Sequence, residues 1–485
     1  MGKNKNNKDI VKNIQNILEN YSITTIGSKL FVFDLALLEL TQEKGLNYIE
    51  KYHLYPGYSK FFASLGILYC KKLLKDKPIT DQEIIQFNKL LDLMSQNNLE
   101  INPIYSVDSM ALAQRDWQRY YPFKTYLIYL FLNNSKIKPI LNSITNNSVS
   151  DFISICLAPK ILSEPIILGI LYEMRIPFSK VFDKLKEYII INFPYLIISI
   201  DDFKAKQLEK IEKASFNLFA SRMLVKDYPI VRVYDEFSIF SSFFYIQDAL
   251  FSRTIREIAE KGQNSKLIGD VFEDIIFNQF VNYYGGVDSE NGNKKILLNP
   301  STKNSGELCD VMLEKGNDTL LIDCKAKELI EEVYINNSQE LNVLVEKFQQ
   351  RIKRIQDIKN GKFNKYYSKG INLDNIYSII VMTDDGVFSK NYLFDKCFPD
   401  LTQEEKEYYN KHIHIISYED LIESITTNVD LLEIIKRSIR NNNYGNHLRL
   451  NIKNEDKSPY NTDFDKWYKS AFDDLTRFLL NNKII

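Results

Sequence analysis

Residues that interrupt regular structure are scarce in this chain, and their scarcity limits what it can fold into. Only 17 of the 485 residues are glycine and 13 are proline, whereas about 7% glycine is usual. Long helices therefore fit the sequence better than an all-β fold with many turns. Hydrophobic residues make up 45% and charged residues 26%. These are ordinary globular values, so they exclude a wholly disordered or collagen-like chain.

The charges of the chain nearly cancel. Lysine and arginine number 62 and aspartate and glutamate 63, so the formal net charge is -1. This balance excludes a bulk polycation such as a histone-like coat protein, although a local basic surface would still be able to bind nucleic acid. The five cysteines form no CxxC pair and the four histidines show no HxxxH or HExxH spacing. A zinc ribbon and a disulfide framework are therefore excluded.

The N-terminus and the most apolar segment indicate a cytoplasmic protein with no membrane partner. Residues 1–8 are rich in Lys and Asn and no apolar core follows them, unlike a secretory signal. The most apolar stretch, residues 188–200, runs into Asp201 and Asp202. It is shorter than the ~20 residues that a membrane-spanning helix needs. We therefore expect a reducing, cytoplasmic environment.

Hydrophobic spacing divides the chain into a large helical N-terminal region and a C-terminal α/β region. Apolar residues such as Ile10, Ile14 and Leu18 recur at helical spacing. We expect this region to select the substrate, to regulate or to oligomerise. Between the two regions we expect an extended piece at 228–234 and a helix at 237–260. The expected division is a helical region at 1–227, a connecting segment at 228–264, an α/β domain at 265–436 and a helical tail at 437–485.

Helical and strand-like patterns alternate in residues 265–436. Residues 319–325 are at first apolar on both faces, which predicts a strand at the centre of a sheet. They follow Lys315-Gly316-Asn317-Asp318, a hairpin turn, and residues 288–295 have the pattern of a polar loop. We expect an α/β sandwich around a mixed sheet. Its elements are a helix at 266–283, strands at 308–313 and 319–325, a helix at 338–359, a strand at 376–382, a further helix, a strand at 412–416 and a last helix capped by Ser417.

Three charged residues of the predicted hairpin fall close together. Asp323 and Lys325 are two residues apart and so project from the same face of their strand. A tight turn would bring Asp310, in the first strand, opposite Asp323 or one pair away. Burying two carboxylates without a partner is costly, and a Mg²⁺ ion, which prefers oxygen ligands, would offset that cost. The carbonyl of Cys324 lies between the two side chains, and Glu273 on the preceding helix can add an acidic ligand.

This arrangement resembles the PD-(D/E)xK nuclease superfamily, whose members share the restriction-endonuclease-like fold. The residues that carry the resemblance are Gly269-Asp270-Val271-Phe272-Glu273, Asp310 and Asp323-Cys324-Lys325. It covers about residues 265–436, where the expected elements match the αβββαβ core of that fold. The resemblance implies that Asp310 and Asp323 bind metal, that Lys325 is the catalytic lysine and that Glu273 is the helical acid. Cys309 stands where many members have proline, a departure that leaves the metal chemistry intact.

The resemblance also implies a function. A magnesium-dependent endonuclease, with manganese able to substitute, would hydrolyse phosphodiester bonds in DNA. A bacterial anti-phage or restriction effector, gated by its helical region, is the expected role. Because cutting both strands takes two active sites, we expect an even oligomer or a partner-regulated complex. Members also use a residue on the helix after the motif to support the site or contact a phosphate, which makes Gln350 a substrate-binding candidate. Lys327 is a second candidate, because it continues the strand face of Lys325.

Other interpretations of the same residues remain open. The nuclease fold could be a catalytically silent module that binds nucleic acid or protein, or a nuclease directed at RNA or at branched structures. Asp274 competes with Glu273 for the role of helical acid, and Lys327 is equally well explained as a solvated side chain. The basic run at 347–359 suits either a solvated helix face or contact with a phosphate backbone.

Overall fold

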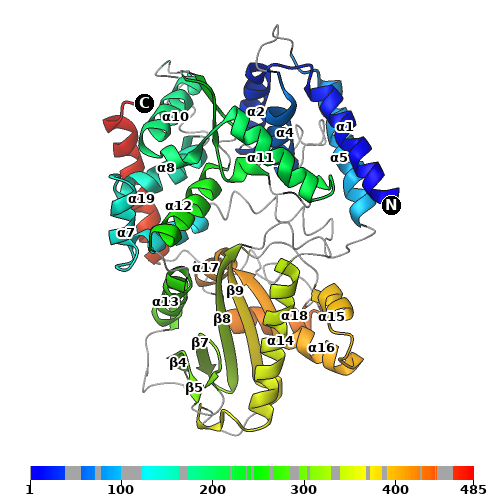
Figure 1. Ribbon diagram of the computed structural model, residues 1–485. Coiled ribbons are helices and arrows are strands. Elements are labelled where there is room, and N and C mark those ends of the chain that lie inside the picture. The colour runs from blue at the N-terminus through cyan, green and yellow to red at the C-terminus, as the bar shows by residue number, and fades with distance from the viewer. Residues whose placement is uncertain are drawn as a thin grey trace. The chain divides into compact units, whose positions relative to one another are not determined.

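The computed structural model of the protein forms two compact units, each described by itself below (Figure 1). The described residues are 2–38, 56–71, 78–99, 122–162, 173, 175, 177–218, 221, 223–235, 237–241, 245–262, 266–284, 294–302, 306–328, 339–366, 372–384, 390–426, 429–442, 444 and 463–485. Those up to 262, together with 467–485, form the first unit, and those between 263 and 466 form the second. None of the helices in these ranges is both long and apolar enough to cross a bilayer.

The first unit is mainly helical. One side of its first helix carries Ile10, Ile14 and Leu18, which are at most 2% exposed. This helix therefore has the apolar face that the sequence predicts. The helices with defined bounds are α1 (Gly2–Leu18), α2 (Ile23–Leu38), α4 (Pro56–Tyr69), α5 (Asp81–Leu99), α7 (Lys138–Ile144), α8 (Val149–Leu162), α10 (Phe178–Asn192), α11 (Ile200–Lys213), α12 (Ile246–Gly262) and α19 (Asp463–Asn481).

A small three-stranded sheet belongs to the same unit. Its strands are β1 (Ile197–Ser199), β2 (Ile230–Tyr234) and β3 (Phe237–Phe240). β1 and β2 are parallel, and β2 and β3 are antiparallel. The extended piece expected at 228–234 is confirmed. The helix expected from residue 237 is wrong at its start, because β3 pairs with β2 and α12 begins only at Ile246.

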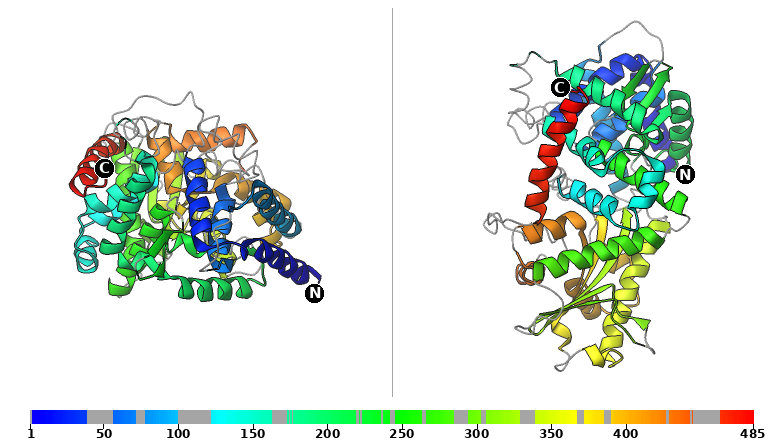
Figure 2. Two further views of the ribbon diagram at one scale, coloured as in Figure 1. Left: turned by 90° about the horizontal axis from the view of Figure 1, so that it is seen from above. Right: turned by 90° about the vertical axis from the view of Figure 1, so that its left-hand side faces the viewer.

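The C-terminal helix α19 packs against helices that are far away in the sequence. The ring of Trp467 lies 4.9 Å from that of Tyr126, and the ring of Phe478 lies 4.9 Å from that of Tyr188 in α10. Figures 1 and 2 show α19 in red beside α8 and α10. Residues 228–262, which the sequence analysis treats as a connection, thus belong with α19 to the helical unit.

The second unit contains a five-stranded mixed sheet in the order β10-β9-β8-β7-β4. β4, β7 and β8 are antiparallel, whereas β8, β9 and β10 are parallel. β8 lies in the middle, as its apolar faces predict. A helical N-terminal region and a C-terminal mixed sheet are thus confirmed. The elements are α13 (Lys266–Tyr284), β4 (Lys294–Leu298), β5 (Ser301–Thr302), β6 (Gly306–Glu307), β7 (Val311–Lys315), β8 (Asp318–Glu328), α14 (Gln339–Lys359), β9 (Ile376–Asp384), α15 (Lys390–Cys397), α16 (Gln403–His412), β10 (Ile413–Ser417), α17 (Tyr418–Thr426) and α18 (Leu431–Arg440).

Strand β4 lies partly where the sequence analysis expects a polar loop. That expectation is wrong for Lys294 and Lys295, which pair with Lys315 and Glu314 of β7. β4 is an edge strand, and charged residues are common on edge strands because they discourage pairing with another chain. The charge that suits an edge position is also what makes the pattern look like a loop.

Helices cover both faces of the sheet. α14 packs on one face through Phe348 and Ile352, which form a core with Ile380 of β9. α13 and α17 pack on the other face, where the ring centroids of Phe272 and Tyr418 are 6.5 Å apart. In Figure 1, α14 lies in front of the strands and α17 behind them. The sheet is therefore buried on both sides, as the apolar sequence of β8 requires.

A tight turn joins β7 to β8 and sets their register. Lys315 pairs with Asp318, which leaves Gly316 as the first of two central residues. Gly316 has a φ of 63°, which glycine adopts without strain and which a type II′ hairpin turn requires at this position. The register that follows pairs Val311 with Ile322, and it fixes the positions of the acidic residues at the other end of the hairpin.

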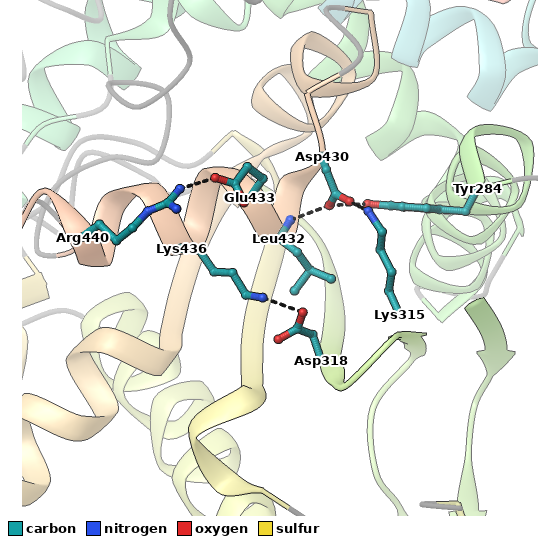
Figure 3. A network of polar contacts seen from close by, with 8 residues as sticks. All are labelled: Tyr284, Lys315, Asp318, Asp430, Leu432, Glu433, Lys436 and Arg440. Atoms are coloured by element: carbon teal, nitrogen blue, oxygen red, sulfur yellow. Dashed lines mark hydrogen bonds and ion pairs between the residues drawn. The ribbon is translucent and has the colours of Figure 1, made fainter. Parts of the chain in front are cut away.

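A polar network ties α18 to the hairpin and to α13 (Figure 3). Asp430 caps α18 by accepting a backbone N–H of its first turn at 2.8 Å. The same carboxylate accepts a hydrogen bond from Tyr284 Oη at 3.0 Å and pairs with Lys315. A second ion pair joins Lys436 to Asp318 at 2.6 Å. Both residues next to the hairpin turn are therefore held by α18.

Replacing Asp430 with alanine should lower the free energy of unfolding of the α/β unit by about 1–2 kcal/mol, because α18 loses its cap. Asp430→Asn keeps a capping side chain and should cost less. Urea denaturation followed by circular dichroism measures both effects. An alanine variant as stable as the wild type would show that this network adds nothing to the fold.

Candidate active site

The two aspartates of the motif lie at the end of the hairpin away from its turn. Asp310 lies directly before β7, and its backbone N–H donates to the Ile322 carbonyl of β8 at 3.0 Å. The β7–β8 ladder ends at the pair of Val311 with Ile322, so Asp310 and Asp323 follow its last pair on the two strands. The sequence predicts Asp310 opposite Asp323 or one pair away, and the structure brings the two charges close to each other without making them a ladder pair. Backbone pairing alone therefore brings two acidic residues together at the end of the hairpin.

The Asp310 carboxylate is buried beside another negative charge. The residue is 8% exposed, and its Oδ2 accepts a hydrogen bond from the Cys324 N–H at 2.6 Å. Burial, and after it the charge of Asp323, raise the pKa of Asp310 to about 6, although the Cys324 N–H and the Lys325 ammonium act in the opposite direction. The charged form of Asp310 is thus costly in the folded protein, as it is wherever carboxylates crowd together away from water.

Asp323 has a counter-ion that the sequence analysis did not assign. Its Oδ2 lies 2.5 Å from Nε of Arg351 in α14, and both side chains are 6% exposed. Nη1 of Arg351 also donates to the Leu308 carbonyl at 3.1 Å. The signal in the sequence is helical phase, since Arg351 falls between Phe348 and Ile352 on the buried side of α14.

Glu273 reaches the same place from α13. Its neighbours Phe272 and Ile276 are buried, whereas Glu273 is only half-buried. Burial, and next the charge of Asp310, raise the pKa of Glu273 to about 7, and Lys325 lowers it. Glu273 therefore interacts with both Asp310 and Lys325 of the motif. This favours it over Asp274 as the acid that the helix contributes.

Lys325 and Lys347 bring positive charge to the carboxylates. The ammonium of Lys325 acts on both Asp310 and Glu273. Lys347 lies on α14, and burial followed by the charge of Lys325 lowers its pKa. The predicted contact residue Gln350 is exposed and accepts a hydrogen bond from Lys347 at 3.0 Å. Its role stays a prediction, and Lys347 is the residue of this helix that faces the site together with Arg351.

Two other residues near the motif carry charge. The side chain of Lys327, predicted to bind substrate, lies outside the described residues. Glu307 is exposed in β6, and its charge adds to the factors that raise the pKa of Asp310 and of Glu273. The negative charge around the motif is therefore larger than the motif itself predicts.

Within the described residues of this unit, the histidines and cysteines are buried or partly buried and serve packing. His412 Nδ1 is 2.9 Å from the Ile376 carbonyl, and His414 Nε2 is 2.9 Å from the Lys411 carbonyl. Burial raises the pKa of Cys324 well above its ordinary value, so its thiol stays protonated. Neither residue type supplies a nucleophile to the hairpin end.

The resemblance to the PD-(D/E)xK superfamily stays a prediction from the motif and the order of helices and strands, because comparison with known proteins gives no match. The chain matches no family model, no curated protein and no solved structure. Within the part of the chain that the structure describes, no group of three or more His, Cys, Asp and Glu side chains is arranged to hold a metal ion. In the arrangement described, Asp323 is paired with Arg351 and Asp310 is hydrogen-bonded to the Cys324 N–H.

The raised pKa of Asp310 predicts an unusual mutant. Because the folded state binds this proton more tightly than the unfolded state, the contribution of Asp310 to stability is present below about pH 4 and is lost as pH rises to about 6. In metal-free buffer, Asp310→Asn should therefore be more stable than the wild type above pH 6, by roughly 1–3 kcal/mol, and equal to it near pH 4. Denaturation at a series of pH values measures the difference.

The matched control is Asp323→Asn, which should have the opposite effect. It removes one partner of a buried ion pair and leaves the guanidinium of Arg351 without its counter-ion, which costs about 3–5 kcal/mol. If both substitutions changed stability in the same direction, the opposing roles of the two carboxylates would be wrong.

Proposed function

We propose that this protein is a metal-dependent nuclease that hydrolyses phosphodiester bonds, with DNA as its substrate. The observation that supports the proposal is the meeting of Asp310, Asp323 and Lys325 at one end of the hairpin, with Glu273 added from α13. These groups are a set of hard oxygen donors with one ammonium beside them. Carboxylates with raised pKa values next to a specific charge partner are typical of functional sites.

The donors suit magnesium. This ion takes oxygen ligands, keeps several waters and is commonly held by one or two carboxylates together with phosphates of the substrate. Asp310 and Asp323 would supply the carboxylates, with the Cys324 carbonyl and Glu273 as further ligands, and manganese would accept the same set. Burial, and next the neighbouring carboxylate charges, raise the pKa of Asp310 and of Glu273. A cation would relieve the repulsion between these charges, which is a second reason for the fit.

The bound ion would polarise the phosphate and lower the pKa of a water. The side chains of the chain itself have separate tasks. Lys325 would orient the attacking water and stabilise the negative charge that develops on the phosphate oxygens. Glu273 would hold the ion, either directly or through a water. Lys347 adds positive charge next to the position of the phosphate.

The helical unit is the proposed source of control. A nuclease that shares a cell with its own host's DNA needs restraint, and the same chain carries a helical unit somewhat larger than the α/β unit. We therefore propose that the helical unit selects the substrate or gates the nuclease, as in a bacterial defence or restriction effector. An even oligomer would allow both strands to be cut.

Cleavage of supercoiled plasmid in Mg²⁺ or Mn²⁺ tests the proposal. Lys325→Ala and Asp310→Asn should each reduce the rate on the order of 10²–10⁴-fold, the range in which positioned acid–base groups contribute. Asp310→Asn is the sharper variant, because it is expected to be inactive and yet more stable than the wild type. Lys266→Ala, which changes an exposed residue at the start of α13, is the control for loss of one positive charge.

The outcomes separate the alternatives. Cleavage that survives in both Asp310→Asn and Lys325→Ala would rule out this site. Absence of cleavage by the wild type on double-stranded, single-stranded and branched DNA and on RNA would favour a silent module that only binds. Preference for RNA or for branched DNA would keep the site and change the substrate.

A further inference from the structure

Arg351 is placed at the site by the direction of α14. Ile358 of this helix packs with Leu321 of β8 and Ile376 of β9. Two turns earlier, Arg351 reaches Asp323, which is closer to the end of β8. The helix therefore runs antiparallel to β8, and its middle, at Arg351, lies over Asp323.

The guanidinium makes two polar contacts in a buried setting. It forms the ion pair with Asp323, and it donates to the carbonyl of Leu308. Leu308 is 0% exposed and Arg351 is 5% exposed. Water is thus largely excluded from both contacts. A carboxylate in this setting requires a positive partner, because burying an unpaired charge is expensive.

The backbone already fixes the spacing of the two aspartates. Asp310 is held by its N–H bond to Ile322 and by the Cys324 N–H on its carboxylate. Arg351 is therefore not needed to bring the acidic residues together. What it adds is positive charge next to the Asp323 carboxylate.

We propose that Arg351 is the resident counter-ion of Asp323. Arg351 holds this carboxylate in the absence of metal, and a divalent cation must displace Arg351 or share the carboxylate with it. The inference rests on the proposed function, because it concerns the same carboxylates. Arg351 is a positioning residue, since it acts through Asp323. By competing for Asp323, it sets the concentration of magnesium at which the site fills.

The stability of the full chain as a function of Mg²⁺ concentration tests this competition without any substrate. A ligand that binds only the folded state stabilises it. Once the ligand concentration exceeds the dissociation constant, the gain in stability grows with the logarithm of that concentration. This rise begins near the dissociation constant, so fitting it gives the Mg²⁺ concentration that half-saturates the folded protein, which is called the midpoint below. Arg351→Met keeps an apolar stem and removes the charge. Its midpoint should lie at about tenfold lower Mg²⁺, within the usual range for coupled binding.

Arg351→Met should also be less stable than the wild type in EDTA and should approach it as Mg²⁺ rises. A merely structural arginine would lower stability equally at every concentration of Mg²⁺. Lys353→Met, which removes one exposed charge from the same helix, should titrate like the wild type. A midpoint for Arg351→Met that is unchanged or higher would overturn the proposal.

A second variant covers the case in which Arg351→Met does not fold. Arg351→Lys keeps the charge and loses the planar fork, so its midpoint should fall by a smaller factor. An unchanged or higher midpoint in this variant also overturns the proposal. A wild type whose stability does not respond to Mg²⁺ or Mn²⁺ at any concentration would refute the metal site itself. A wild type that responds, with Arg351 variants that titrate like it, would refute the counter-ion alone.

Discussion

The register of the β7–β8 hairpin is the constraint on which the candidate site depends. Gly316 permits a two-residue turn, and the pairing that follows ends at Val311 and Ile322, so that Asp310 and Asp323 come next on the two strands. A slip of one residue would move every side chain of one strand to the other face of the sheet. The buried sheet prevents such a slip, because it would bring charged residues into apolar layers on both sides. The chemistry of the hairpin end is therefore fixed by packing that takes place elsewhere.

The same hairpin concentrates charge in a place where charge is costly. Asp310 and Glu273 have raised pKa values, and Asp323 is buried against Arg351. A protein selected only for stability would not need such a group of carboxylates. Functional sites commonly carry local features that reduce stability and are compensated elsewhere. Here the surrounding sheet, the helices on both faces and the α18 network supply that compensation.

The failures of the sequence analysis have two physical causes. β3 lies in a small sheet and β4 at the edge of a larger one. The sequence does not predict either strand, because short strands in such positions show little alternation of apolar and polar residues, and their polar residues resemble those of loops or helix ends. Arg351 received no role because its partner is brought to it by tertiary packing of α14 on β8. The helical periodicity of α14 places Arg351 on the same buried side as Phe348 and Ile352. This periodicity predicts that the arginine is buried, but it does not predict which acidic residue the arginine pairs with.

The sequence by itself determined the helical N-terminal region, the central position of β8, the hairpin turn and the closeness of Asp323 and Lys325. Each of these follows from local periodicity or from glycine at a turn, which are properties of neighbouring residues. Only the tertiary structure decided between Glu273 and Asp274 as the acid that meets the hairpin. It also decided that Arg351 meets the hairpin and that α19 packs with the helical unit. These contacts join segments far apart in the chain. Burial of apolar faces drives them, and a single sequence shows which faces are apolar but not which faces pack against each other.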